Sequence, residues 1–151
     1  MLDRTETAIL RVLEEDARLS YAELADKVAL SKTPCWARVR DLEQRGVIKG
    51  YRTELDPTQL GLEIHAFIHA TINPAKHAEF ETAAIRHRSV LQCFTTAGEG
   101  DYLLHVLVPS IADLDQILRA EISRMPGVQR SMTTVCLKTI KDRSSLIGCL
   151  R

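Results

Sequence analysis

The sequence predicts an α+β protein with two parts, an N-terminal winged helix-turn-helix and a C-terminal ferredoxin-like (βαββαβ) domain. Three observations carry this prediction. Apolar residues recur at helical spacing over the first third of the chain, their period changes to two from Leu62 onward, and a turn-rich segment separates the two patterns. The expected organisation is a first domain over residues 1–52, a linker over 53–61 and a second domain over 62–151.

Composition excludes several classes. The 151 residues are 45% hydrophobic and 26% charged, which is typical of a globular chain and not of a disordered or collagen-like one. No apolar run approaches the roughly 20 residues needed to cross a bilayer, and the first residues do not form a secretory signal. We therefore expect a cytoplasmic protein with no membrane contact. The cysteines are too widely spaced for a metal knuckle or a disulfide framework, so we expect reduced thiols, no metal and no cofactor: Cys35, Cys93, Cys136 and Cys149.

The charge is balanced overall but unevenly distributed. Twenty basic and twenty acidic residues give zero formal charge. Residues 31–52, however, hold six Lys or Arg against two Asp or Glu, whereas residues 1–30 hold four against seven. Affinity for a polyanion would therefore have to come from this one short cationic stretch.

The first domain is expected to contain three helices. Leu2 to Ala17 is amphipathic, and Ser20 with Glu23 forms a capping box that starts a second helix ending near Ala29. A third helix follows almost at once, with Ser31 as N-cap, Pro34 in the first turn and Gly46 at its end. Its buried stripe is expected to be Cys35, Val39 and Leu42, and residues 47–52 are predicted to form a strand.

This order of helices, with a tight turn before a cationic third helix, is typical of a DNA-binding helix-turn-helix. Lysine and arginine neutralise phosphates, and Thr33, Arg40 and Gln44 carry donors that base edges accept. We expect Trp36 to pack at a helix or dimer contact. The alternative to a DNA-binding role is a solvated amphipathic helix with ordinary surface arginines. The candidate DNA-binding residues are Ser31, Lys32, Thr33, Trp36, Ala37, Arg38, Arg40, Gln44 and Arg45.

The second domain is expected to alternate strands and helices. The order strand, helix, strand, strand, helix, strand predicts two helices on one face of an antiparallel sheet. Phe67, with Leu103 or Leu104, is expected on the other face, where a second subunit would cover it. The tail over 139–151 is expected to pair with a neighbour. The predicted strands are 62–72, 90–97, 102–108 and 128–138, and the predicted helices are 74–88 and 110–125.

Five motifs, in order and at the expected spacing, resemble the Lrp/AsnC (feast/famine) family of transcription regulators. The resemblance covers essentially the whole chain. The motifs are Asp3 to Leu13, Leu30 to Glu43 (LSKTPCWARVRDLE), Gly46 to Tyr51 (GVIKGY), Gly98 to Leu104 (GEGDYLL) and Met125 to Val128 (MPGV).

The resemblance implies a regulator that binds double-stranded DNA and senses a small amino acid. It implies dimerisation through the sheet and further assembly of dimers, up to octamers, with amino acids bound where dimers meet. The implied effector-binding residues are Gly98, Glu99, Gly100, Asp101, Thr133 and Thr134. Thr33 to Trp36 and the tail Ser144 to Leu146 resemble a branch with cysteine-responsive members. Leucine, branched-chain and proline responses stay open.

Two other functions share this architecture. Sirohaem decarboxylases are enzymes of similar organisation, and the histidines could be proposed as haem ligands or proton donors: His65, His69, His77, His87 and His105. However, two histidines four residues apart on a strand are about 13 Å apart, too far to hold one metal. We expect no enzyme activity and no catalytic residue. The second alternative is an amino-acid sensing module that does not bind DNA.

Overall fold

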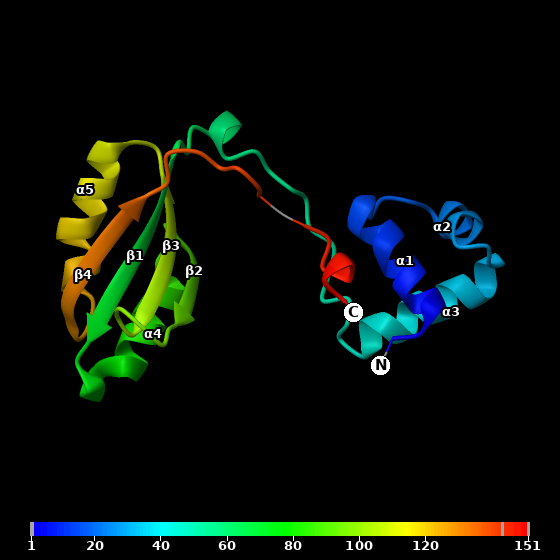
Figure 1. Cartoon of the computed structure of the whole chain (residues 1–151), viewed down its shortest axis with the longest axis horizontal. Coiled ribbons are helices and arrows are strands. Elements are labelled where there is room, and N and C mark those ends of the chain that lie inside the picture. The colour runs from blue at the N-terminus through cyan, green and yellow to red at the C-terminus, as the bar shows by residue number, and fades with distance from the viewer. Residues whose placement is uncertain (1, 143, 151) are drawn as a thin grey trace. The chain divides into compact units, whose positions relative to one another are not determined.

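The computed structural model describes residues 2–142 and 144–150, which form two compact units (Figure 1). One unit holds the chain up to Glu54 together with the segment from Lys141 onward, and the other holds Leu55–Ile140. The chain therefore passes twice between the units. This differs from the expected second domain over 62–151, because the end of the chain packs with the N-terminal unit.

The N-terminal unit contains three helices, α1 (Arg4–Glu15), α2 (Tyr21–Lys27) and α3 (Lys32–Gln44). Capping boxes start α1 at Asp3 and α2 at Ser20, each with a glutamate at the third helical position. The helices meet through a small apolar core of Ile9, Leu10, Leu24, Ala25, Cys35, Val39, Leu42 and Ile147. The buried stripe predicted for the third helix is thereby confirmed.

The connection between α2 and α3 is a tight turn that closes the end of α2. The amide of Leu30 donates to the carbonyl of Ala25 at 2.9 Å, and Ala29 between them has a positive φ of 54°. This is the geometry of a Schellman cap, in which a left-handed residue reverses the chain. A non-glycine residue in that conformation is uncommon. The turn therefore fixes how α3 leaves α2.

The strand predicted over residues 47–52 is not formed, and that prediction is wrong. In this part of the described chain the amides of Val47 and Ile48 both donate to the carbonyl of Leu42, at 2.9 and 3.1 Å, and so cap α3. A strand needs a neighbour to pair with its backbone groups. The β-forming side chains here have no adjacent strand, so the segment continues as irregular chain to a 3-10 turn over Thr58–Leu60.

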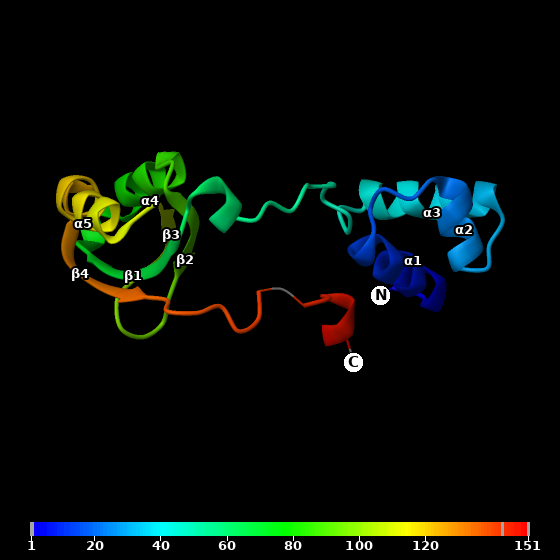
Figure 2. The same ribbon diagram turned by 90° about the horizontal axis from the view of Figure 1, so that it is seen from above.

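The C-terminal unit is an antiparallel sheet of four strands in the order β2-β3-β1-β4. The strands are β1 (Ile64–Ile72), β2 (Val90–Thr95), β3 (Tyr102–Val108) and β4 (Val128–Val135). Helices α4 (His77–Arg86) and α5 (Ile111–Ala120) lie on the same side of the sheet (Figure 2). Burial alternates along β1 and β3, so one sheet face forms a core with the helices and the other stays open.

The described end of the chain, residues 144–150, packs on α1. Ile147 is 9% exposed and belongs to the core of the N-terminal unit. The carboxylate of Glu14 accepts from the amide of Leu146 at 2.8 Å and from the hydroxyl of Ser145. Burial opposes ionisation of Glu14, but these hydrogen bonds outweigh it and lower its pKa. The tail is thus a structural part of the helical unit.

Candidate nucleic-acid interface and effector site

Helix α3 buries one face and exposes the other. Cys35, Val39 and Leu42 are at most 1% exposed, and they hold α3 against α1 and α2. The helical period places the opposite side chains in solvent. The exposed residues of α3 and its N-cap include Ser31, Lys32, Thr33, Trp36, Ala37, Arg40 and Gln44. These seven of the nine predicted DNA-binding residues therefore come together on one accessible surface, which we call the outer face of α3.

Trp36 and Arg40 interact within the outer face. The guanidinium carbon of Arg40 lies 5.4 Å from the centre of the Trp36 ring, one helical turn away. Trp36 is 46% exposed, so it does not pack into the core of its own unit. Among the described residues Arg40 makes no ion pair. Its charge is therefore held over an aromatic ring but left free for an anion.

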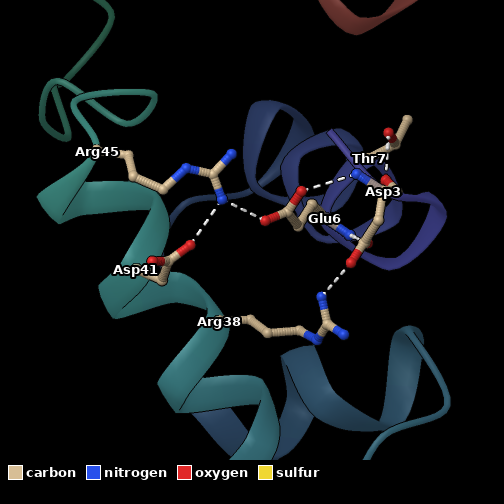
Figure 3. A network of polar contacts seen from close by, with 6 residues as sticks. All are labelled: Asp3, Glu6, Thr7, Arg38, Asp41 and Arg45. Carbon is tan, nitrogen blue, oxygen red and sulfur yellow. Dashed lines mark hydrogen bonds and ion pairs between the residues drawn. The ribbon is translucent and has the colours of Figure 1, made fainter. Parts of the chain in front are cut away.

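The other two candidate arginines, Arg38 of α3 and Arg45 at its C-cap, point toward α1 (Figure 3). Arg38 donates to Asp3 at 2.5 Å, and Arg45 donates to Glu6 at 2.5 Å and to Asp41 at 2.6 Å. The Glu6 amide and, next, Arg38 hold the pKa of Asp3 below its ordinary value. The Asp3 amide and Arg45 do the same for the pKa of Glu6. Both acids are therefore ionised at neutral pH, and the two arginines are paired.

The predicted effector turn, residues 98–101, joins β2 to β3. Gly100 has a φ of +91°, and an added Cβ would lie 3.2 Å from the carbonyl oxygen of Ala70, so glycine is required there. The Asp101 carboxylate accepts from the amide of Ile72 at 2.7 Å, and the Asp101 amide donates to Ala70 at 2.9 Å. Asp101 therefore ties the turn to β1, with one of its carboxylate oxygens already engaged.

A shallow hollow of about 100 Å³ lies beside this turn on the open face of the sheet. Glu99 and Gly100 line it, but Asp101 and Gly98 do not. The Nδ1 of His69 lies 3.0 Å from the carbonyl oxygen of Glu99 and fixes the rim. The remaining lining residues, absent from the predicted set, are His69, Thr71, Arg130 and Met132. The pairing of Thr71 with Arg130 and of His69 with Met132 explains why these four gather.

The two threonines predicted on the last strand separate. Thr133 pairs with Ile68, which is fully buried, so Thr133 lies on the helix-covered face. Thr134 pairs with Phe67 and lies on the open face. Neither lines the hollow. The period of two along a strand requires this separation, since adjacent residues point to opposite faces.

The open face of the sheet carries an aromatic cluster. The ring of Phe67 stacks on that of His105 at 4.8 Å, and His65 lies 5.5 Å from His105. Leu103 lies on this face beside them, whereas Leu104 is fully buried on the other face. The alternative that places Leu104 on the open face is therefore wrong. Burial, followed by the charge of His65, lowers the pKa of His105.

The remaining histidines have local partners. His77 contacts the hydroxyl of Tyr102, which itself donates to Glu81 at 2.7 Å. Burial and then this carboxylate raise the pKa of Tyr102 to about 12. The Nε2 of His87 lies 2.8 Å from Glu121. Within residues 2–142 and 144–150 no group of three potential metal ligands gathers, and no helix is long and apolar enough to span a membrane.

The chain joins a helical unit that has a cationic outer face to an open βαββαβ sheet that has a hollow at a glycine turn. This combination is typical of regulators that couple DNA binding to ligand binding. The family models agree with this class, matching a winged helix-turn-helix DNA-binding domain over residues 2–49 and an Lrp/AsnC ligand-binding domain over residues 65–146. The chain belongs to the Lrp/AsnC family of DNA-binding transcriptional regulators.

Relatives of known sequence and structure support the assignment over nearly the whole length. The leucine-responsive regulatory protein of Escherichia coli K12 is 36% identical over 149 residues, covering 97% of this chain and 91% of that protein. A transcriptional regulator from Neisseria meningitidis, in complex with L-Met, is 34% identical with a TM-score of 0.93, covering 97% and 96% of the two chains. AsnC of E. coli is 28% identical with a TM-score of 0.86, covering 95% and 97%.

Proposed function

We propose that the outer face of α3 enters the major groove of double-stranded DNA and reads bases there, with one α3 from each subunit of a dimer. One observation supports the proposal most directly: α3 buries one face in the core of its unit and exposes the cations Lys32 and Arg40 on the other. The free amides at the start of α3, with Ser31, suit a phosphate oxygen. Thr33, Ala37 and Gln44 lie on the same face and suit base edges.

Replacing Arg40 by alanine tests this proposal. We expect Arg40→Ala in the full chain to weaken retention of DNA from the region upstream of its own coding sequence. Arg88→Ala, which removes an exposed arginine of the other unit, is the matched control because it changes the net charge equally. Equal retention by the two variants would contradict a reading role for α3.

We also propose that the hollow beside the effector turn binds a small amino acid. Arg130 suits the ligand carboxylate, and Glu99 suits its ammonium group. The match to a ligand-binding family model supports this proposal, as does the L-Met complex of the Neisseria regulator. Four predicted effector residues do not line the hollow of the single chain, and they would contribute only indirectly to the site: Gly98, Asp101, Thr133 and Thr134.

Calorimetry with each proteinogenic amino acid tests the effector proposal. We expect one of them, with cysteine as the first choice from the family branch and leucine, other branched-chain amino acids and proline next, to bind the full chain. Arg130→Gln should abolish that binding, whereas Lys138→Gln, an exposed cation beyond β4, should leave it unchanged. No heat with any amino acid would remove the sensing proposal.

Assembly is the third part of the proposal. A second copy would cover the open sheet face at Phe67 and Leu103, giving a homodimer, and dimers would associate further, up to an octamer. An amino acid bound at contacts between dimers would shift the population of assemblies and so change the spacing of the α3 helices along DNA. Sedimentation velocity should show Phe67→Asp as smaller than the wild-type assembly.

We place this regulator in the cytoplasm, where its DNA target lies, and assign it no catalytic activity, metal or cofactor. The alternative haem-related enzyme predicts a stoichiometric Soret band in the purified protein, which we expect to be absent. The alternative sensing module predicts no DNA retention at modest ionic strength. The two alternatives are therefore separated from the proposal by absorbance and by DNA retention.

A further inference from the structure

The two arginines of α3, Arg38 and Arg40, and the arginine at its C-cap, Arg45, divide between two faces of the helix. Arg38 and Arg45 are separated by seven positions, two helical turns, and both side chains reach toward the start of α1 (Figure 3). Arg40 projects from the outer face beside Trp36. The three cations therefore do not form one patch, although sequence alone gives them the same DNA-contacting role.

The capping box of α1 receives both inward-facing arginines. One oxygen of Asp3 accepts from the amide of Glu6 at 2.7 Å, and the other accepts from Arg38. One oxygen of Glu6 accepts from the amide of Asp3 at 2.7 Å, and the other accepts from Arg45. All four carboxylate oxygens thus have a donor. The start of α1 therefore binds α3 through two arginines, Arg38 and the C-cap residue Arg45, which lie two helical turns apart.

The pair of Glu6 and Arg45 is the better enclosed of the two contacts. Glu6 is 7% exposed, and it is a buried charged residue of the described chain. Arg45 joins it to Asp41 on α3 itself, so the guanidinium is held between two helices. Loss of Arg45 would leave the enclosed Glu6 carboxylate without its cation, which destabilises the contact between α1 and α3.

We infer that Arg45, acting through Glu6, is a positioning residue that sets the orientation of α3 for DNA, with Arg38 and Asp3 as the second point of the same clamp. The phosphate and base contacts then belong to the outer face around Arg40. This inference rests on the proposed DNA-binding role of α3. It revises the role, but not the importance, of two of the predicted DNA-binding residues.

Substitution of Glu6 tests the inference, because a purely electrostatic effect and a positioning role predict opposite changes in DNA affinity. Glu6→Gln removes a negative charge, so electrostatics alone would strengthen binding to a polyanion. A positioning role predicts weaker binding instead, by at least about fivefold, because α3 loses its clamp. The measurement is the equilibrium affinity of the full chain for duplex fragments from the region upstream of its coding sequence.

The salt dependence of binding gives a second, independent test. The slope of log K against log salt falls by about one for each DNA phosphate that the protein no longer neutralises. Arg40→Gln should therefore reduce both the affinity and the slope. Arg45→Gln should reduce the affinity but leave the slope at its wild-type value. The double variant Glu6→Gln with Arg45→Gln should bind about as well as either single variant, because both act through one ion pair.

Folding is controlled in the same samples by the fluorescence of Trp36, the single tryptophan of the chain. Arg45→Lys provides a milder variant, because it keeps the charge but loses the fork that joins Glu6 to Asp41, and it should bind less tightly at unchanged slope. A slope that falls by about one for Arg45→Gln, or tighter binding by Glu6→Gln, would overturn this inference alone. A wild-type chain that retains no DNA would overturn the proposed function as well.

Discussion

Truncation of Ile147 should destabilise the helical unit, even though this residue lies over ninety positions after Glu54, where the first segment of that unit ends. Ile147 is 9% exposed and shares a core with Ile9, Leu10 and Leu42. Removing the isoleucine side chain beyond Cβ from a core typically costs 2–5 kcal/mol. Because Ile147 lies at the edge of a small core, we expect about 2 kcal/mol for Ile147→Ala. In a unit of this size that corresponds to a fall in melting temperature of about 10 °C.

The assay is thermal or urea unfolding of the full chain, followed by fluorescence. Trp36 is the only tryptophan and lies in the helical unit, so its emission reports on that unit selectively. The matched control is Leu146→Ala, which truncates a neighbouring residue that is 75% exposed and should change stability by less than about 0.5 kcal/mol. Equal unfolding curves for the two variants would refute the reasoning that the tail completes this core.

Two further predictions concern the sheet unit. Asp101→Ala removes the acceptor of the Ile72 amide and should lower the free energy of unfolding by about 1–2 kcal/mol, measured on the full chain by circular dichroism. Asp101→Asn keeps an acceptor oxygen and should lower it by less. Equal losses for the two variants would contradict the hydrogen-bonding role. The lowered pKa of His105 means that the folded sheet binds this proton less tightly than the unfolded chain. Stability should therefore be unaffected above pH 6.5, the ordinary value, fall as the pH drops from there to the folded pKa, and level off below it. His105→Gln should flatten this dependence, and an unchanged pH profile would show that another group is responsible.

Local sequence signals predicted most of the elements. The capping box at Ser20 and the stripe of Cys35, Val39 and Leu42 depend on residues within one or two helical turns, so spacing alone reveals them. Predicted strand 102–108 agrees with β3 for the same reason, because alternation over seven residues is strong. Predicted helices and strands elsewhere are longer than the observed ones by a few residues. At the start of α4 and after the end of α5, the 3-10 turns Pro74–Lys76 and Ile122–Arg124 take the place of predicted helix.

The errors arise where distant parts of the chain meet. The stretch 47–52 has strand-forming residues but no strand beside it, and local propensity does not report the absence of a partner. Ile147 is separated from α1 by most of the chain, so its role in the first core has no local signal. Arg130 joins the hollow only through the register of β1 with β4.

The sequence predicts which side chains of the third helix are cationic and solvent-facing, but not which of them pair with α1. Helical spacing places Arg38 and Arg45 on one face and Arg40 on another, yet it does not show that the first two meet Asp3 and Glu6. That contact requires the crossing of α1 with α3, which the three-dimensional packing of the core determines. The cationic stretch therefore holds an exposed cation, Arg40, as well as two arginines that are paired with the start of α1.

The central claim is that the outer face of α3 touches bases, and site-specific photo-crosslinking tests it most directly. A photoreactive residue at Ala37, an exposed position of α3 with a small side chain, should crosslink to bases of the bound duplex. The same residue at Ala78, an exposed position of α4, should not. Crosslinks from Ala78 with none from Ala37, in a chain that retains the DNA, would contradict the assignment of α3 as the element that reads DNA.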